Sequence, residues 1–161
     1  MRVRAAVPED AEAIASIHVR AWQVAYAHVF PPERLAELDV ARRAQHWREG
    51  FESGWQPLVT DDVTGFVSVG PSRDVAGEGE LYAIYVAPEH WGTGRGRTLM
   101  ERAVEELRRQ GFEEATLWVL EDNPRARRFY EAAGWRTDGA VKEDEFLGTP
   151  VREVRYRISL R

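Results

Sequence analysis

The chain has 161 residues, of which 43% are hydrophobic and 30% charged, with a formal net charge of −5 at pH 7 and no cysteine. This length fits a single domain over residues 1–161, and the composition is that of an ordinary globular protein. The missing cysteine excludes disulfides, thiolate metal sites and a cysteine nucleophile. The negative charge argues against a nucleic-acid partner.

Membrane and metal partners are not expected either. The first residues, Met1–Arg4, lead into Pro8 without the apolar stretch of a secretory signal. No apolar run approaches the length of a membrane span, so we expect a cytoplasmic protein. The four histidines lie far apart and lack metal-ligand spacing, so no metal site is predicted.

The N-terminal part predicts a short strand at residues 2–6 and then a helix. Pro8 and the acidic residues after it suit a first helical turn. In this helix His18, Trp22 and Tyr26 recur every four residues, so their rings lie along one side. This stripe is equally compatible with core packing and with an aromatic wall for a substrate. Prolines at 31 and 32 end the helix, and two shorter helical segments follow at 33–38 and 41–49.

The middle of the chain predicts two antiparallel strands, 58–60 and 65–69, followed by a flexible loop at 71–79 to which no chemistry is assigned. An apolar strand at 81–86 leads into a glycine-rich turn and an amphipathic helix that stops near Gly111. A further strand at 115–120 precedes a helix from Pro124 to Gly134, with Asn123 as its N-cap. Residues 135–140 and 151–160 alternate apolar and polar side chains, which predicts a closing hairpin around an acidic link.

The glycine-rich turn predicts an anion site. Gly92, Gly94 and Gly96 let the backbone approach a ligand and adopt positive φ. The helix that follows directs its unpaired amides at the turn, where they attract phosphate. Neither the P-loop nor the dinucleotide fingerprint fits the spacing. The alternative is a glycine-rich connection that only turns the chain.

Two segments resemble the GNAT acetyltransferase superfamily. Residues 84–100 are similar to its acetyl-CoA signature, although Trp91 stands where the signature has Gln or Arg. Residues 117–135 are similar to its motif of Asn, Tyr and a Gly-aromatic pair. The resemblance implies the GNAT fold, an α/β (α+β) architecture. Its central sheet is mixed and mostly antiparallel, flanked by helices, with a splayed parallel pair at the centre.

The resemblance also implies site residues, with acetyl-CoA as the cofactor. Glu80 would be the general base and Tyr130 the general acid, with Glu121 and Asp122 as reserve candidates for the base. An exposed carboxylate at a strand end is the alternative for Glu80. Trp22, Tyr26 and Glu80 would line the acceptor site. The expected cofactor-binding residues are Ile84, Tyr85, Val86, Gly92, Thr93, Gly94, Arg95, Gly96, Arg97, Asn123 and Tyr130.

Together these features predict an acetyl-CoA-dependent N-acetyltransferase that moves the acetyl group directly to a primary amine in a ternary complex. An alkyl amine is deprotonated only to roughly one part in 10³ at pH 7, so a general base would raise the rate. The negative charge and the aromatic residues favour a cationic acceptor, either a small molecule or a protein. A non-catalytic acyl-CoA sensor and a protein-interaction domain are the alternatives. A homodimer is expected from the family alone.

Overall fold

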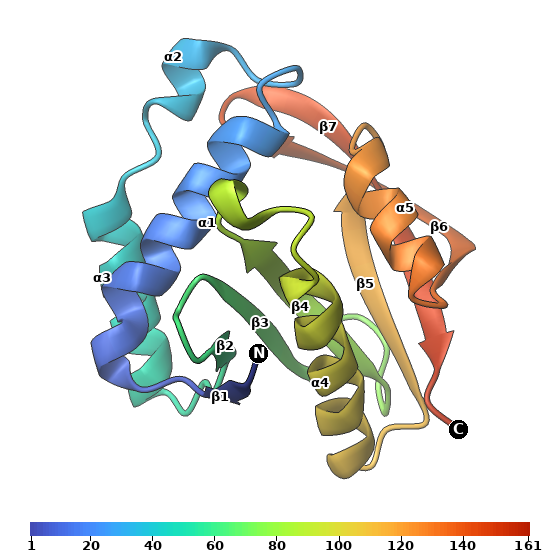
Figure 1. The fold of residues 1–161 in the computed structure, drawn as a ribbon. Helices are drawn as coiled ribbons and strands as arrows, with labels where there is room; N and C mark the ends of the chain where they lie inside the picture. The colour runs from blue at the N-terminus through green and yellow to red at the C-terminus, as the bar shows by residue number, and fades with distance from the viewer. The chain divides into compact units, whose positions relative to one another are not determined.

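The computed structural model describes all 161 residues (Figure 1). The strands are β1 (Val3–Ala5), β2 (Leu58–Thr60), β3 (Gly65–Pro71), β4 (Gly79–Val86), β5 (Glu114–Leu120), β6 (Arg136–Phe146) and β7 (Thr149–Ser159). The α-helices are α1 (Ala11–Ala25), α2 (Pro32–Leu35), α3 (Val40–Glu52), α4 (Arg95–Arg109) and α5 (Pro124–Ala132), and the 3₁₀ turns are η1 (Pro8–Asp10) and η2 (Pro88–His90).

The strands form one sheet in the order β1-β2-β3-β4-β5-β7-β6. The pairings of β1 with β2, β2 with β3, β5 with β7 and β6 with β7 are antiparallel. Strands β4 and β5 are parallel, and their pairing joins Gly79 to Ala115 and Glu80 to Thr116. The expected mixed, mostly antiparallel sheet with a parallel pair is therefore confirmed. None of the helices combines the length and the apolar character needed to cross a bilayer.

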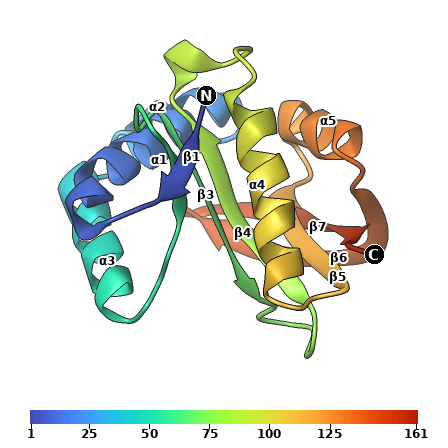
Figure 2. The same cartoon turned by 60° about the horizontal axis from the view of Figure 1, so that its bottom comes forward.

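The chain divides into two compact units, residues 1–68 with 83–103 and residues 69–82 with 104–161. The expectation of a single domain stays a prediction. In the first unit, α1 and α3 lie side by side (Figure 2) and share a core with β2 and β3. Its largest members are Trp47 and Phe66, at 5% and 0% exposed. Amphipathic spacing in α1 buries Ile14 and Ile17 on this face.

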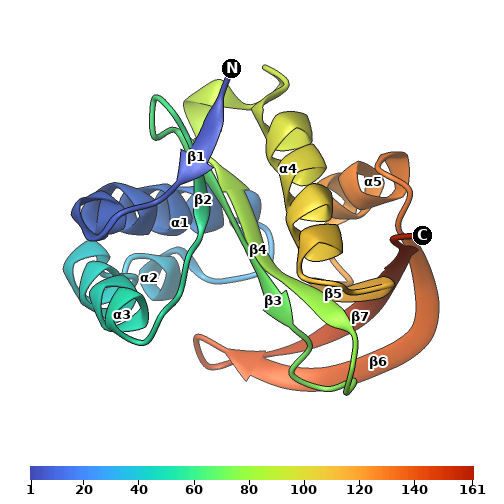
Figure 3. The same cartoon turned by 90° about the horizontal axis from the view of Figure 1, so that it is seen from below.

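In the second unit, β5 lies between β4 and the β6–β7 hairpin (Figure 3). Helix α5 packs on β7, with the Tyr130 and Tyr156 ring centroids 6.2 Å apart. Gly79 allows α4 to approach β4 closely, because a Cβ there would lie 2.7 Å from Leu107 Cδ2. Asn123 Oδ1 accepts a hydrogen bond from the Ala126 amide at 3.2 Å, which confirms the predicted N-cap of α5.

The predicted acidic link between the last two strands is wrong, because most of it is strand. β6 continues through its charged residues to Phe146, and the turn is only Leu147 and Gly148, with φ of 51° and 74°. Two positive φ values in succession are the geometry of a tight hairpin. Cross-strand pairing, such as Lys142 opposite Glu153, stabilises residues that have low intrinsic strand propensity.

Candidate active site

The glycine-rich turn lies in the first unit and contains two glycines with positive φ. Gly92 and Gly94 have φ of 76° and 86°, and a Cβ at either would meet no atom within 4 Å. Conformation rather than space therefore selects glycine at both positions. The positive φ expected at Gly96 is wrong, because Gly96 lies in the first turn of α4. The Thr98 amide donates to the Gly94 carbonyl at 3.1 Å, which is the first backbone hydrogen bond of α4. The amides of residues 95–97 lie before it and have no acceptor within the helix. Unpaired amides at a helix N-terminus suit a phosphate group.

Trp91 ties this turn to the end of β4. Its indole Nε1 donates to the Val86 carbonyl at 2.8 Å. The side chain that replaces the Gln or Arg of the family signature is therefore a structural donor at the base of the turn. The sequence marked Trp91 as a departure but contained no sign of this hydrogen bond.

The two arginines of the turn differ in their partners. Arg95 Nη2 donates to Asp62 Oδ2 at 2.9 Å, and its Nη1 donates to Thr93 Oγ1 at 2.9 Å. Burial opposes the charged form of Asp62, but hydrogen bonds from Thr64, Arg95 and Thr60 outweigh it and lower the pKa of this carboxyl. The Arg95 guanidinium thus holds the turn in shape. Arg97 is mostly exposed beside Glu101, and its guanidinium is available to a bound anion.

The predicted aromatic stripe is part of a larger cluster in the first unit. Trp22 Nε1 donates to the Tyr85 hydroxyl at 2.8 Å, and the His18 ring stacks on Tyr85 at 4.7 Å. The Trp22 ring also contacts Tyr26 and Phe30, at centroid distances of 4.6 and 5.8 Å. Tyr85 comes from β4, so the sequence spacing of one helix could not reveal it as a member of the cluster.

His18 is neutral in this cluster. Burial, followed by the nearby charges of Arg43 and His46, lowers its pKa to about 3. Its Nδ1 is buried and has no hydrogen-bond partner. His18 therefore acts as a packing residue at physiological pH.

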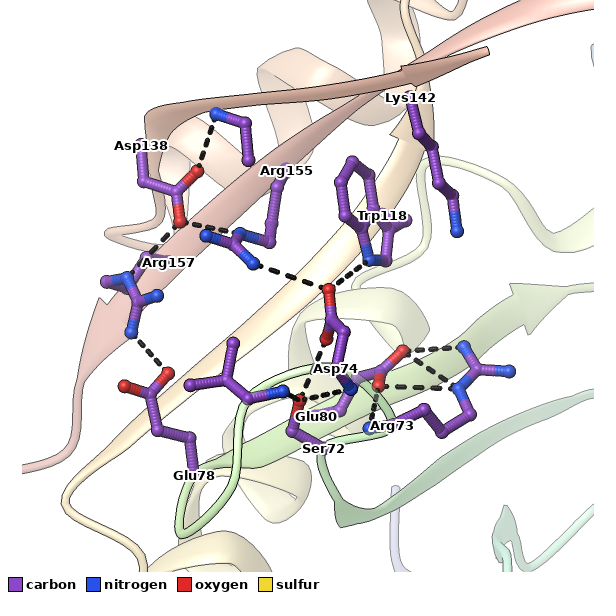
Figure 4. A network of polar contacts seen from close by, with 12 residues as sticks. Ser72, Arg73, Asp74, Glu78, Glu80, Trp118, Asp138, Lys142, Arg155 and Arg157 are labelled. Atoms are coloured by element: carbon purple, nitrogen blue, oxygen red, sulfur yellow. Dashed lines mark hydrogen bonds and ion pairs between the residues drawn. The ribbon is translucent and has the colours of Figure 1, made fainter. Parts of the chain in front are cut away.

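Glu80 is buried in the second unit and is bound by Arg73 (Figure 4). The Arg73 amide donates to Glu80 Oε1 at 2.9 Å, and Arg73 Nη2 donates to Oε2 at 2.5 Å, while Nε lies 3.3 and 3.2 Å from the two oxygens. Glu80 is only 1% exposed, so the alternative of an exposed carboxylate at a strand end is wrong. The loop at 71–79, for which the sequence predicts no chemistry, supplies this partner.

Other polar side chains of the second unit lie close to Glu80 and Arg73 and form a network of hydrogen bonds (Figure 4). Asp74 Oδ2 accepts hydrogen bonds from Trp118 Nε1 at 3.2 Å and from Arg155 Nη1 at 3.3 Å. Arg155 also donates to Asp138 at 2.7 Å. Three segments far apart in the chain, namely the β3–β4 loop, β5 and the β6–β7 hairpin, are joined by these bonds.

Tyr130 is 8% exposed, as expected for a ring that turns inward. The reserve candidates for the base, Glu121 and Asp122, are both exposed, and Glu121 pairs with Arg152 at 3.2 Å. Nearby, Arg127 donates to the Tyr156 hydroxyl and to the Glu121 carbonyl, at 3.0 and 3.1 Å. Arg127 is therefore held within the protein, whereas Arg128 is exposed.

Comparison with known proteins agrees with this architecture. The model of the acetyltransferase (GNAT) family matches residues 11–135, so the chain belongs to this family. It is 35% identical over 160 residues to the uncharacterized N-acetyltransferase YuaI of Bacillus subtilis (strain 168), covering 94% of this chain and 89% of that protein. It is also 29% identical over 168 residues to the probable N-acetyltransferase Rv2775 of Mycobacterium tuberculosis, covering 98% and 93% of the two chains.

Solved structures share the fold at lower identity. One is yncA from Salmonella typhimurium with its cofactor acetyl-CoA, with a TM-score of 0.75, 24% identity and coverage of 100% and 94% of the two chains. Another is the PaiA N-acetyltransferase from Thermoplasma acidophilum in complex with coenzyme A, with a TM-score of 0.75, 19% identity and 98% coverage of both. The expected fold and family are confirmed, and the enzyme class they define is that of an N-acyltransferase.

Proposed function

We propose that this protein transfers an acetyl group from acetyl-CoA directly to a primary amine, in a ternary complex and without a covalent enzyme intermediate. The observation that carries the proposal is the turn at residues 91–97, where two glycines with positive φ precede the free amides of α4. This arrangement fits a pyrophosphate. Family membership and fold neighbours solved with coenzyme A or acetyl-CoA support the same donor.

The reaction needs a free amine lone pair, a polarised carbonyl and a proton for the departing thiolate. Acetyl-CoA, when bound, supplies the activated acetyl group as a thioester. The amides of Ile84, Tyr85 and Val86 would hold the pantetheine arm and polarise the carbonyl. The Asn123 side chain would bind the arm beyond its capping role, and the Tyr130 hydroxyl would protonate the thiolate.

Glu80 is the proposed proton acceptor for the amine. Both of its oxygens accept hydrogen bonds from Arg73. The amine, or a water that relays its proton, therefore reaches Glu80 only when the guanidinium of Arg73 moves aside. Arg73 is suited to such movement, because its side chain is 67% exposed.

Trp22 and Tyr26 are the proposed wall of the acceptor site. Tyr26 is 6% exposed and packs mainly inside its own cluster, whereas Trp22 is partly exposed. Trp22 is therefore the one of the two that offers an accessible ring to an acceptor.

Titration calorimetry with acetyl-CoA, followed by an assay of free-thiol release over a panel of amines, tests this function. We expect binding and amine-dependent thiol release, with turnover lowered about 10²-fold or more in Glu80→Gln and in Tyr130→Phe. Full turnover in both variants would contradict the assigned roles. Binding without thiol release on any amine would favour a sensor, and no binding at millimolar acetyl-CoA would leave only an interaction domain.

A further inference from the structure

Lys142 is the only lysine of the chain, and its ammonium lies against an aromatic ring and a buried carboxylate. Lys142 Nζ is 4.4 Å from the centroid of the Trp118 ring and 3.9 Å from Glu153 Oε1. Figure 4 shows the lysine side chain running alongside Trp118. A ring face and a carboxylate that converge on one point are the chemistry that recognises an alkylammonium group.

Glu153 has one charged partner in its own protein, Lys142, and its side chain is 12% exposed. The residue is 9% exposed, its carboxylate accepts no hydrogen bond from another residue, and its ion pair with Lys142 is too long to be a hydrogen bond. Burial raises the pKa of Glu153, with Asp144 adding to this effect and the charges of Lys142 and Arg73 opposing it. Neither carboxylate oxygen of Glu153 is among the fully buried polar atoms that lack a partner, so solvent reaches this carboxylate. An ammonium ligand that also contacts the Trp118 ring would replace that solvent with a charge-assisted hydrogen bond.

Lys142 is able to leave this position. Its side chain is 43% exposed, and β6 is an edge strand of the sheet. Trp118 does not depend on Lys142 for its orientation, because its Nε1 is held by Asp74. Arg155 lies near the same ring, 5.6 Å from the centroid, but is fixed by Asp74 and Asp138. The ring and the carboxylate would therefore stay in place when the lysine swings out.

Trp118 and Glu153 lie near a residue with a role in the proposed reaction. Glu153 on β7 is directly opposite Leu120, the last residue of β5, and Asn123 follows three residues later. The proposed function assigns Asn123 to the pantetheine arm. An ammonium held by an ion pair stays protonated and has no lone pair for attack. Trp118 and Glu153 are therefore suited to hold a second amino group of the acceptor, not the one that reacts.

We infer that Trp118 and Glu153 form the binding site for a non-reacting ammonium of the acceptor, which Lys142 occupies until the acceptor displaces it. This inference rests on the proposed function and narrows its acceptor to primary amines that carry a second cationic amino group. The competing explanation is an ordinary cross-strand ion pair, since Lys142 and Glu153 are register partners in the hairpin.

Because Lys142 is the only lysine of the chain, its displacement by an ammonium ligand can be followed from one set of NMR signals. Protein labelled with ¹³C and ¹⁵N only at lysine gives one set of side-chain NMR signals, which the Trp118 ring shifts away from those of free lysine. Titration with putrescine, without acetyl-CoA, should move these signals to the free-lysine position, and 1-butanol should not. A lysine signal that stays in place at millimolar putrescine would overturn the inference.

Matched variants separate the two explanations. Glu153→Gln should weaken putrescine binding by about 10-fold or more, the range for a lost charge-assisted bond. Glu143→Gln, which removes the same charge from an exposed neighbour of Lys142 in β6, should not. Lys142→Met should bind putrescine more tightly, as measured by calorimetry, because the competitor is gone. Equal affinities in all three variants would show an ordinary cross-strand pair.

The test of the ammonium site and the test of the transferase proposal can fail independently of each other. Displacement of Lys142 is measured without a donor, so its failure overturns this site alone and leaves the thiol-release assay to decide the transfer reaction. If thiol release does occur, the Michaelis constant should be lower for putrescine than for n-butylamine, and Glu153→Gln should abolish that difference. An unchanged difference in Glu153→Gln would place the second ammonium elsewhere.

Discussion

Arg73 encloses the carboxylate of Glu80 from two sides, with its backbone amide on Oε1 and its guanidinium on both oxygens. The carboxylate is 1% exposed, whereas the arginine side chain is 67% exposed. The same guanidinium lies 5.0 Å from the centroid of the Tyr82 ring. A buried acid at the start of β4 therefore depends for its charge balance on a residue that can move into solvent.

The first prediction concerns the stability of this pair. Arg73→Ala should lower the free energy of unfolding by about 1–3 kcal/mol, because it leaves a buried acceptor without its charged donor. Glu80→Gln in the Arg73→Ala background should recover part of this loss, since a neutral amide is cheaper to leave buried. Urea unfolding of both single variants and the double variant measures the coupling. Additive effects would mean that the two side chains do not depend on each other.

A second prediction follows from His18. Its pKa is about 3 in the folded protein, below the roughly 6.5 of an unfolded chain. The unfolded state therefore binds the proton more readily between these values, and stability falls as the pH is lowered through this window. The maximal slope is about 1.4 kcal/mol per pH unit. Carboxyl groups with a lowered pKa add their own losses mainly below about pH 4, and Glu153, whose pKa is raised, changes stability in the opposite sense. The contribution of His18 is therefore obtained by comparing variants over the interval from about pH 6.5 to 5.

Unfolding free energies at pH 7.5 and 5.0 measure this contribution. The drop between them should shrink in His18→Phe, which keeps a ring against Tyr85 but cannot take up a proton. His28→Gln is the control, because His28 is exposed, and it should retain the full drop. A His18 ring that titrates near pH 6.5 in the NMR spectrum of the native protein would contradict the prediction.

The third prediction concerns Gly94. An alanine at φ of 86° should cost about 1–2 kcal/mol of stability, since side chains with a Cβ rarely adopt this conformation. It should also weaken acetyl-CoA binding, because the turn relaxes away from the geometry that directs its amides at the ligand. Gly54→Ala is a matched control, with φ of 96° and equally open surroundings beyond the end of α3. Similar stability losses with weaker binding only in Gly94→Ala would support the anion site.

The sequence allowed prediction of features whose cause is local. Positive φ at Gly92 and Gly94 follows from glycine spacing beside a helix, and the Asn123 cap follows from the Asn-Pro pair. The burial of Glu80 could not be predicted, because it depends on how the loop that carries Arg73 closes over β4. The Lys142–Glu153 ion pair could not be predicted for a similar reason. It requires the register of β6 with β7, and a bulge between Thr137 and Val141 shifts that register away from simple alternation.

Trp91 provides the last prediction, because it stands at the Gln or Arg position of the acetyl-CoA signature that residues 84–100 resemble. Its indole binds the Val86 carbonyl at 2.8 Å, so the chemistry required at this position is a hydrogen-bond donor at the base of the turn. Trp91→Gln restores the signature residue and keeps a donor, whereas Trp91→Phe keeps an aromatic ring and removes the donor. We expect the acetyl-CoA dissociation constant to stay within about threefold in Trp91→Gln and to rise about fivefold or more in Trp91→Phe, the range for one lost hydrogen bond. Calorimetry on both variants measures it, and the reverse order would show that the ring, not the donor, shapes the turn.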